Sequence, residues 1–233
     1  LPDLAVSSYT STLSALKRAR SADQRRVDGD GRPVVLAVGM PTTPPIGDLK
    51  LADLPGVSDE LDRLGRRFAC RRLRTATRRE QERATPVSAD RLPTVERVRD
   101  ALSGHAWVHL ACHGGQDPDD PSSGAVYLAD GPLTVLRIAA LDLRAAELAF
   151  LSACRTAVGG VDLRDESIHL AAAMQVAGYR HVVATAWSIS DEHTPEVVDR
   201  TYSRLTSGSG VPDVRGCARA LHHAVAALRA ELP

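Results

Sequence analysis

Two short stretches decide the fold that this sequence predicts: Val108–Gly115, which reads VHLACHGG, and Leu148–Thr156, which reads LAFLSACRT. Each begins as an apolar run of strand length and then changes abruptly to small and polar residues. Such a run is typical of a strand buried in a parallel sheet, because helices cover both faces of that sheet. Open α/β sheets place their chemistry beyond the carboxyl ends of the strands. If the two strands are parallel neighbours, His113 and Cys154 meet at that edge, where an imidazole can activate a thiol.

The rest of the chain alternates segments that have the patterns of strands and helices. Further strands are expected at 34–39, 68–73 and 181–186, with a hairpin formed by 125–128 and 133–135. Helices are expected from a cap at Ser58 to Phe68 and over 90–102, 136–141, 165–177, 194–205 and 213–232. This order predicts an α/β domain whose central sheet is mostly parallel and carries helices on both faces.

Composition and charge exclude several other classes of protein. The 29 basic and 29 acidic residues cancel, so the net charge gives no reason to expect nucleic acid or a membrane surface as a partner. No apolar run of about 18 residues is present, and the N-terminus lacks the pattern of a signal peptide. The four cysteines are too widely spaced for a disulfide scaffold, which favours a cytoplasmic location. Because the chain begins with leucine, we expect it to be part of a longer chain.

Three groups of motifs resemble the CHAT family, a caspase-like cysteine peptidase domain that is similar to the separase protease domain. The first two are Ala111–Gly114 (ACHG) and Leu151–Thr156 (LSACRT). The third comprises Asp165–Glu166, Ala177–Arg180 (AGYR), Val182–Trp187 (VVATAW) and Asp191. The match extends to Ser7–Thr10 and Leu54–Gly56, so it implies a single caspase-like domain over residues 1–233, a three-layer sandwich. The chain departs from the family pattern at its end, which lacks the usual closing strand.

The resemblance implies a cysteine endopeptidase that acts through a His-Cys dyad. Cys154 would attack the scissile carbonyl, and His113 would maintain the thiolate and then protonate the leaving amine. Backbone N–H groups at Gly114 and Cys154 would stabilise the oxyanion. We expect no cofactor and no metal. Zinc bound by Cys112, His113 and Cys154 is disfavoured, because adjacent side chains on a strand diverge and the sequence shows no fourth ligand.

Acidic residues near the strand ends predict a preference for substrates with a basic P1 residue. In the similar separase segment an aspartate receives a basic P1 side chain, which implies this role for Asp191, and Asp165 and Glu166 would add negative charge. Each has an alternative interpretation: Asp191 caps the turn before Thr194, and the other two occupy a first helical turn, where the helix dipole favours acids.

The expected partners are a protein or peptide substrate and a regulatory domain. The resemblance implies control by a partner or by a fused domain such as TPR repeats, in a bacterial signalling or defence pathway. The alternative function is a non-catalytic caspase-like interaction module. A nucleotide-binding domain is disfavoured because the first strand ends in Val38–Pro41 (VGMP), without a glycine-rich phosphate loop. The arginine-rich stretch Arg63–Arg83 is interrupted by acids and has few aromatics, which favours a solvated surface over a nucleic-acid site.

Overall fold

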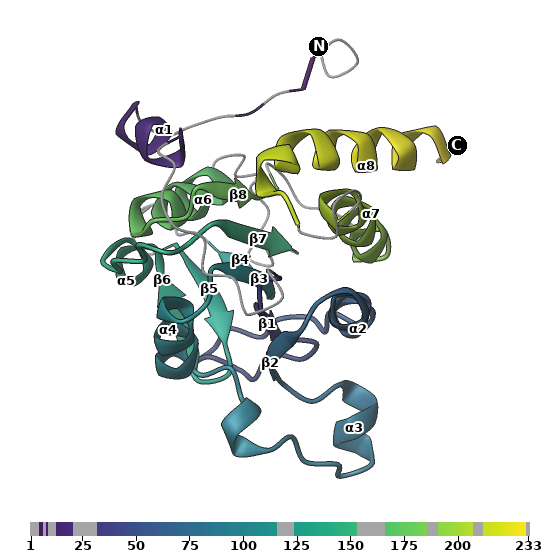
Figure 1. The fold of residues 1–233 in the computed structure, drawn as a ribbon. Coiled ribbons are helices and arrows are strands. Elements are labelled where there is room, and N and C mark those ends of the chain that lie inside the picture. The colour runs from purple at the N-terminus through teal and green to yellow at the C-terminus, as the bar shows by residue number, and fades with distance from the viewer. Residues whose placement is uncertain are drawn as a thin grey trace.

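A parallel sheet of five strands forms the centre of the domain (Figure 1). The computed structural model describes residues 5–6, 8, 13–20, 32–115, 124–152, 166–185, 191–206 and 212–231. In spatial order the strands are β2 (Cys70–Arg74), β1 (Val35–Gly39), β3 (Trp107–Ala111), β7 (Leu148–Ser152) and β8 (His181–Val183). All four pairings are parallel. Every residue of β1, β3 and β7 is buried, as their largely apolar runs predict.

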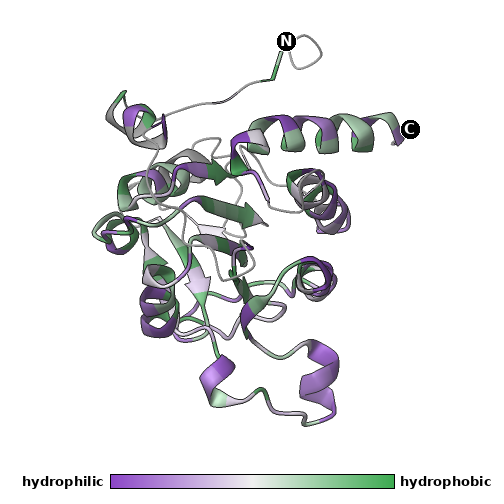
Figure 2. Ribbon diagram, viewed as in Figure 1, coloured by the Kyte–Doolittle hydropathy of each residue, from purple (hydrophilic) through white to green (hydrophobic). Residues whose placement is uncertain are grey.

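Helices cover both faces of this sheet, so the predicted three-layer α/β sandwich is confirmed (Figure 1). On one face lie α2 (Gly56–Arg67), α7 (Thr194–Thr206) and α8 (Cys217–Glu231). On the other lie α4 (Val95–Ser103), α5 (Val135–Ala139) and α6 (Glu166–Ala177). Two further helices, α1 (Leu13–Arg20) and α3 (Arg78–Glu82), also belong to the chain. Figure 2 shows the apolar strands at the centre and the polar α3 at the periphery.

A small antiparallel sheet follows the end of β3. It consists of β4 (Gly114–Gly115), β5 (Ala125–Leu128) and β6 (Gly131–Thr134). The predicted hairpin is therefore confirmed. The Gly- and Asp-rich composition of 114–124 predicts a loop, and this is wrong for 114–115, because these residues pair with β5 beside the bond from the Tyr127 N–H to the His113 carbonyl oxygen, 2.9 Å long.

Two helix starts also differ from the prediction. The cap of α2 is not Ser58, because the helix begins at Gly56, whose N–H donates to the Asp191 carboxylate at 2.7 Å. The expected helix at 90–102 is divided into a 3₁₀-helix η1 (Ala89–Arg91) and α4, with Leu92 in an extended conformation. Proline at 93 explains the break, since a residue before proline disfavours the helical region. Similarly, a 3₁₀-helix η3 (Val214–Gly216) precedes α8. Within the described part of the chain, no helix has both the length and the apolar character that crossing a membrane requires.

Candidate active site

The register of β3 and β7 has the same interval as the two candidate catalytic residues have in the sequence. Trp107 pairs with Leu148 and Ala111 with Ser152, so each residue of β3 lies beside the residue 41 positions later. The same separation joins His113 to Cys154. The expectation that the two strands are parallel neighbours is confirmed. Cys154 itself lies outside the described residues.

Among the described residues, the imidazole of His113 has one hydrogen-bond partner. The side chain is 0% exposed, and its Nε2 lies 2.7 Å from the carbonyl oxygen of Ala52. Because a carbonyl oxygen only accepts hydrogen bonds, Nε2 is the protonated nitrogen. The other nitrogen, Nδ1, is buried and has no hydrogen-bond partner in the described part of the chain. A neutral ring in this setting therefore presents an unused lone pair.

Alternation along the strands separates His113 from its neighbour Cys112. Trp107 and Ala111, on the same alternate positions as His113, contribute to the core beneath α2 and α7. Leu148 and Phe150, on the same alternate positions as Cys154, belong to that core as well. Cys112 is buried in the opposite core, beneath α4 to α6, which agrees with the prediction that it packs on the other face.

Unsatisfied polar groups gather at the carboxyl edge of the sheet. Among the described residues, buried side-chain atoms without a hydrogen-bond partner occur at Thr43, His113, Ser152 and Thr185, which lie at or just after the ends of β1, β3, β7 and β8. Tyr179, which precedes β8, is the remaining example in that part of the chain. Leaving such a group unpaired costs about 1–3 kcal/mol, so a concentration at one edge indicates a binding or catalytic site.

Comparison with known protein families agrees with this fold. A model of the CHAT domain matches residues 4–232, which is almost the whole chain. The chain belongs to the CHAT domain family. The CHAT domain is a caspase-like domain of peptidase type, and the family resemblance that the sequence suggested is therefore confirmed. Among curated proteins, none matches the chain.

Asp191 lies at the same end of this CHAT domain and joins two helices. Its Oδ2 accepts the N–H of Gly56 at 2.7 Å, at the positive end of the α2 dipole. A Cβ on Gly56 would come within 2.5 Å of the Asp191 carbonyl oxygen, so this close approach requires glycine. The family-like Leu54–Gly56 motif thus has a physical explanation. This contact could not be predicted from sequence patterns, because 135 positions separate the partners.

The other predicted site residues are only partly described. Gly114 is buried in β4, where it pairs with Val126 directly after His113. Asp165 lies outside the described residues, and Glu166 begins α6, with its side chain also outside the description. The roles of these residues and of Asp191 in substrate binding therefore stay predictions. No cluster of three or more His, Cys, Asp or Glu side chains suited to a metal ion occurs within the described ranges.

Two features near the site of the CHAT domain escaped prediction. Ala52 contributes only its backbone carbonyl, and it lies in a proline-rich segment that is tied down by the bond from Leu54 N–H to the Pro41 carbonyl oxygen, 2.9 Å long. On β3, His109 Nε2 lies 2.7 Å from Glu60 Oε1 of α2, and both side chains are almost completely buried. The His109 Nδ1 lies 3.2 Å from the Tyr202 hydroxyl of α7. This network connects the histidine strand to α2 and α7, two of the three helices in that layer.

Proposed function

We propose that this CHAT domain is a cysteine endopeptidase in which Cys154 is the nucleophile and His113 is the general base and acid. The observation that carries the proposal is the buried imidazole of His113, which donates through Nε2 to Ala52 and leaves Nδ1 without a partner among the described residues. The 41-position register of β3 and β7 supports a thiol as the missing partner, since Cys154 follows His113 by that interval.

The position of the ring proton sets the direction of proton transfer. With hydrogen on Nε2, the Nδ1 lone pair accepts the proton of the Cys154 thiol. The thiolate sulfur then forms a bond to the scissile carbonyl carbon. As the carbon–nitrogen bond breaks, the proton on Nδ1 passes to the leaving amine. Water, deprotonated by the same nitrogen, hydrolyses the thioester and regenerates the thiol. The Ala52 carbonyl stabilises the imidazolium, because its oxygen carries partial negative charge.

Backbone amides at Gly114 and Cys154 are the proposed donors to the oxyanion. Gly114 follows the histidine directly, and its pairing with Val126 restrains the backbone at this point. Donors held in place before the reaction stabilise developing charge without further reorganisation.

A basic P1 residue is the proposed preference, with Asp191 as the receiving carboxylate. One of its oxygens is engaged by the Gly56 N–H, but a carboxylate accepts about four hydrogen bonds, which leaves capacity for a guanidinium or ammonium group. Asp165 and Glu166 are proposed to add negative charge.

The P1 proposal is tested with a library of peptides that differ only at P1. The parent should cleave best after Arg or Lys. Asp191→Asn keeps an oxygen for Gly56 but removes the charge, and should lower kcat/KM for basic P1 by about tenfold or more. Equal use of acidic and basic P1 residues would contradict the preference.

The dyad is tested by labelling with a peptidyl electrophile and locating the modified cysteine by mass spectrometry. Burial raises the pKa of Cys70 to about 11 and that of Cys217 to about 12, and Cys112 is 2% exposed. Near neutral pH the modification should therefore fall on Cys154.

Alanine substitutions of two histidines test whether the labelling of Cys154 depends on His113. His113→Ala should slow the labelling of Cys154 by about 100-fold, whereas His105→Ala should leave it unchanged. His105 is a suitable control, because its ring also bonds a backbone carbonyl, that of Ala101, but in a different part of the fold. Equal labelling of Cys154 in the parent and in His113→Ala would favour the non-catalytic interaction module instead.

A further inference from the structure

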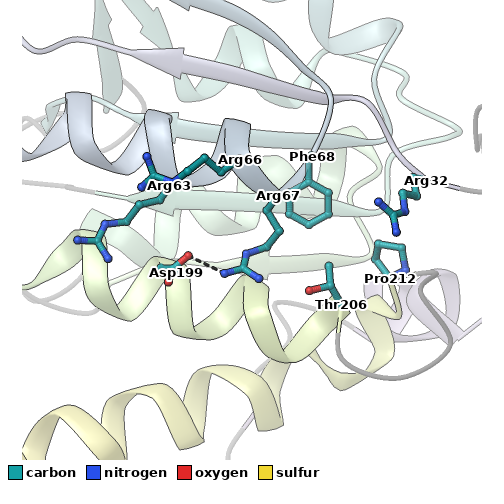
Figure 3. A pocket seen from close by; sticks show the side chains of 8 residues that line it. All are labelled: Arg32, Arg63, Arg66, Arg67, Phe68, Asp199, Thr206 and Pro212. Atoms are coloured by element: carbon teal, nitrogen blue, oxygen red, sulfur yellow. Dashed lines mark hydrogen bonds and ion pairs between the residues drawn. The ribbon is translucent and has the colours of Figure 1, made fainter.

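A cavity of about 470 Å³ lies between α2 and α7, at the end of α2 remote from the candidate active site (Figure 3). The helix begins at Gly56 beside Asp191 and ends at Arg67, and its 12 residues span about 18 Å. Four arginines and a single acidic residue, Asp199, line the cavity. The arginines are Arg32, Arg63, Arg66 and Arg67.

Among the described residues that line the cavity, Asp199 is the only acid. Arg67 pairs with Asp199 at 2.8 Å, which connects α2 to α7, and Arg63 pairs with Asp59 on its own helix at 2.8 Å. Arg66 is exposed and forms no hydrogen bond or ion pair within the described ranges.

The helix dipole explains only part of this concentration of charge. Arg66 and Arg67 occupy the last turn of α2, where the negative end of the dipole favours cations. Arg32 belongs to the segment before β1 and reaches the cavity from outside the helix, beyond Phe68 (Figure 3). A helix end alone does not account for an arginine from a separate segment, or for the cavity between them.

We propose that this cavity binds a small oligophosphate anion, either free or as the phosphate chain of a nucleotide. Guanidinium groups bind phosphate oxygens through two parallel hydrogen bonds, and they retain their charge at any physiological pH. The volume lies within the range of small-molecule sites, about 300–1,000 Å³. Arginines spaced along a helix and across the cavity match several phosphates better than one. The inference does not depend on peptidase activity.

Calorimetric titration of the 233-residue chain with inorganic triphosphate, ATP and adenosine tests this site. In about 100 mM salt, both phosphate compounds should bind saturably with one site per chain, and adenosine should not bind. Binding of ATP that is tighter than that of triphosphate by about tenfold would identify a nucleotide as the ligand, and equal binding would identify the free anion. Failure of both phosphate compounds to bind saturably would overturn the proposal.

A matched pair of double variants locates the binding. Arg63→Gln with Arg66→Gln should weaken triphosphate binding by about tenfold or more, because each charged hydrogen bond contributes strongly. Arg99→Gln with Arg144→Gln removes the same charge from exposed positions elsewhere and should have little effect. Equal losses of triphosphate affinity in the two double variants would show that the anion is attracted by the net charge of the chain and not by this cavity, and would overturn the proposal. Circular dichroism shows whether each variant folds. If Arg63→Gln with Arg66→Gln does not fold, the single substitution Arg66→Gln, at an exposed side chain, replaces it in the binding measurement.

Discussion

The Nε2 of His113 and the carbonyl oxygen of Ala52 lie 2.7 Å apart, although 61 positions separate the two residues. A backbone carbonyl thus orients the candidate base. The carbonyl is held by the segment before α2, where Leu54 is completely buried and bonds Pro41. The geometry of the candidate site therefore depends on the packing of this segment as much as on the two sheet strands.

The ring tautomer of His113 follows from this contact. At a pH where the ring is neutral, we expect hydrogen on Nε2 and none on Nδ1. Long-range ¹⁵N–¹H correlation spectra distinguish the two nitrogens. His105 is an internal control that should show the other tautomer. Its Nδ1 lies 2.7 Å from the Ala101 carbonyl oxygen and should therefore carry the hydrogen. The same tautomer at both histidines would contradict the geometry.

Gly56→Ala should destabilise the domain and distort the candidate site. The new Cβ would come within 2.5 Å of the Asp191 carbonyl oxygen, which has to move, at a cost of about 1–3 kcal/mol in the free energy of unfolding. Urea denaturation measures the loss. Gly104→Ala is the control, because its Cβ would meet nothing nearer than 3.7 Å, and its stability should change by about 0.5 kcal/mol or less. Equal losses of stability for Gly56→Ala and Gly104→Ala would show that Gly56 and Asp191 do not lie so close together.

Glu60→Ala should destabilise the domain by about 3 kcal/mol. The substitution leaves the buried Nε2 of His109 without its acceptor and creates a cavity between α2 and β3. Thermal and urea unfolding measure the loss. Glu96→Ala, at a side chain that is 80% exposed, should cost about 0.5 kcal/mol or less. A loss below about 1 kcal/mol for Glu60→Ala would show that the pair contributes little.

Glu80 should make stability depend on pH in the acid range. The hydrogen bond from Arg74 and the backbone N–H of Thr77 lower the pKa of this carboxyl to about 2. Because the folded-state pKa is below the unfolded value, the contribution is complete above about pH 5 and disappears as the pH falls toward 2. The group is partly exposed, so we expect only about 0.5–1 kcal/mol.

Comparison with Glu80→Gln isolates this contribution. The difference in unfolding free energy between the parent and the variant should be largest near neutral pH and should shrink as the solution is acidified from pH 5 toward 2. A difference in unfolding free energy that stays constant over this pH range would show that the charge of the Glu80 carboxylate does not contribute to stability.

The local sequence was sufficient to predict most of the elements. The runs of β1, β3 and β7 identify buried parallel strands because almost every residue in them is apolar or small. The helix expected at 165–177 does end at Ala177, because Gly178 follows with a φ of 132°, a conformation that favours glycine. The start of α2 and the pairing of Gly114 were missed, since each depends on a backbone N–H or carbonyl group that meets a distant partner.

Sequence alone determined the layers, the family and the 41-position interval between His113 and Cys154, because hydrophobic periodicity and motif spacing are properties of the chain itself. Only the tertiary structure decided that Ala52 orients the histidine, that Asp191 caps α2 and that Glu60 meets His109. These contacts join segments 61, 135 and 49 positions apart, and two of them use backbone atoms that every residue possesses. Such groups leave no pattern in a sequence, and folding alone brings them together.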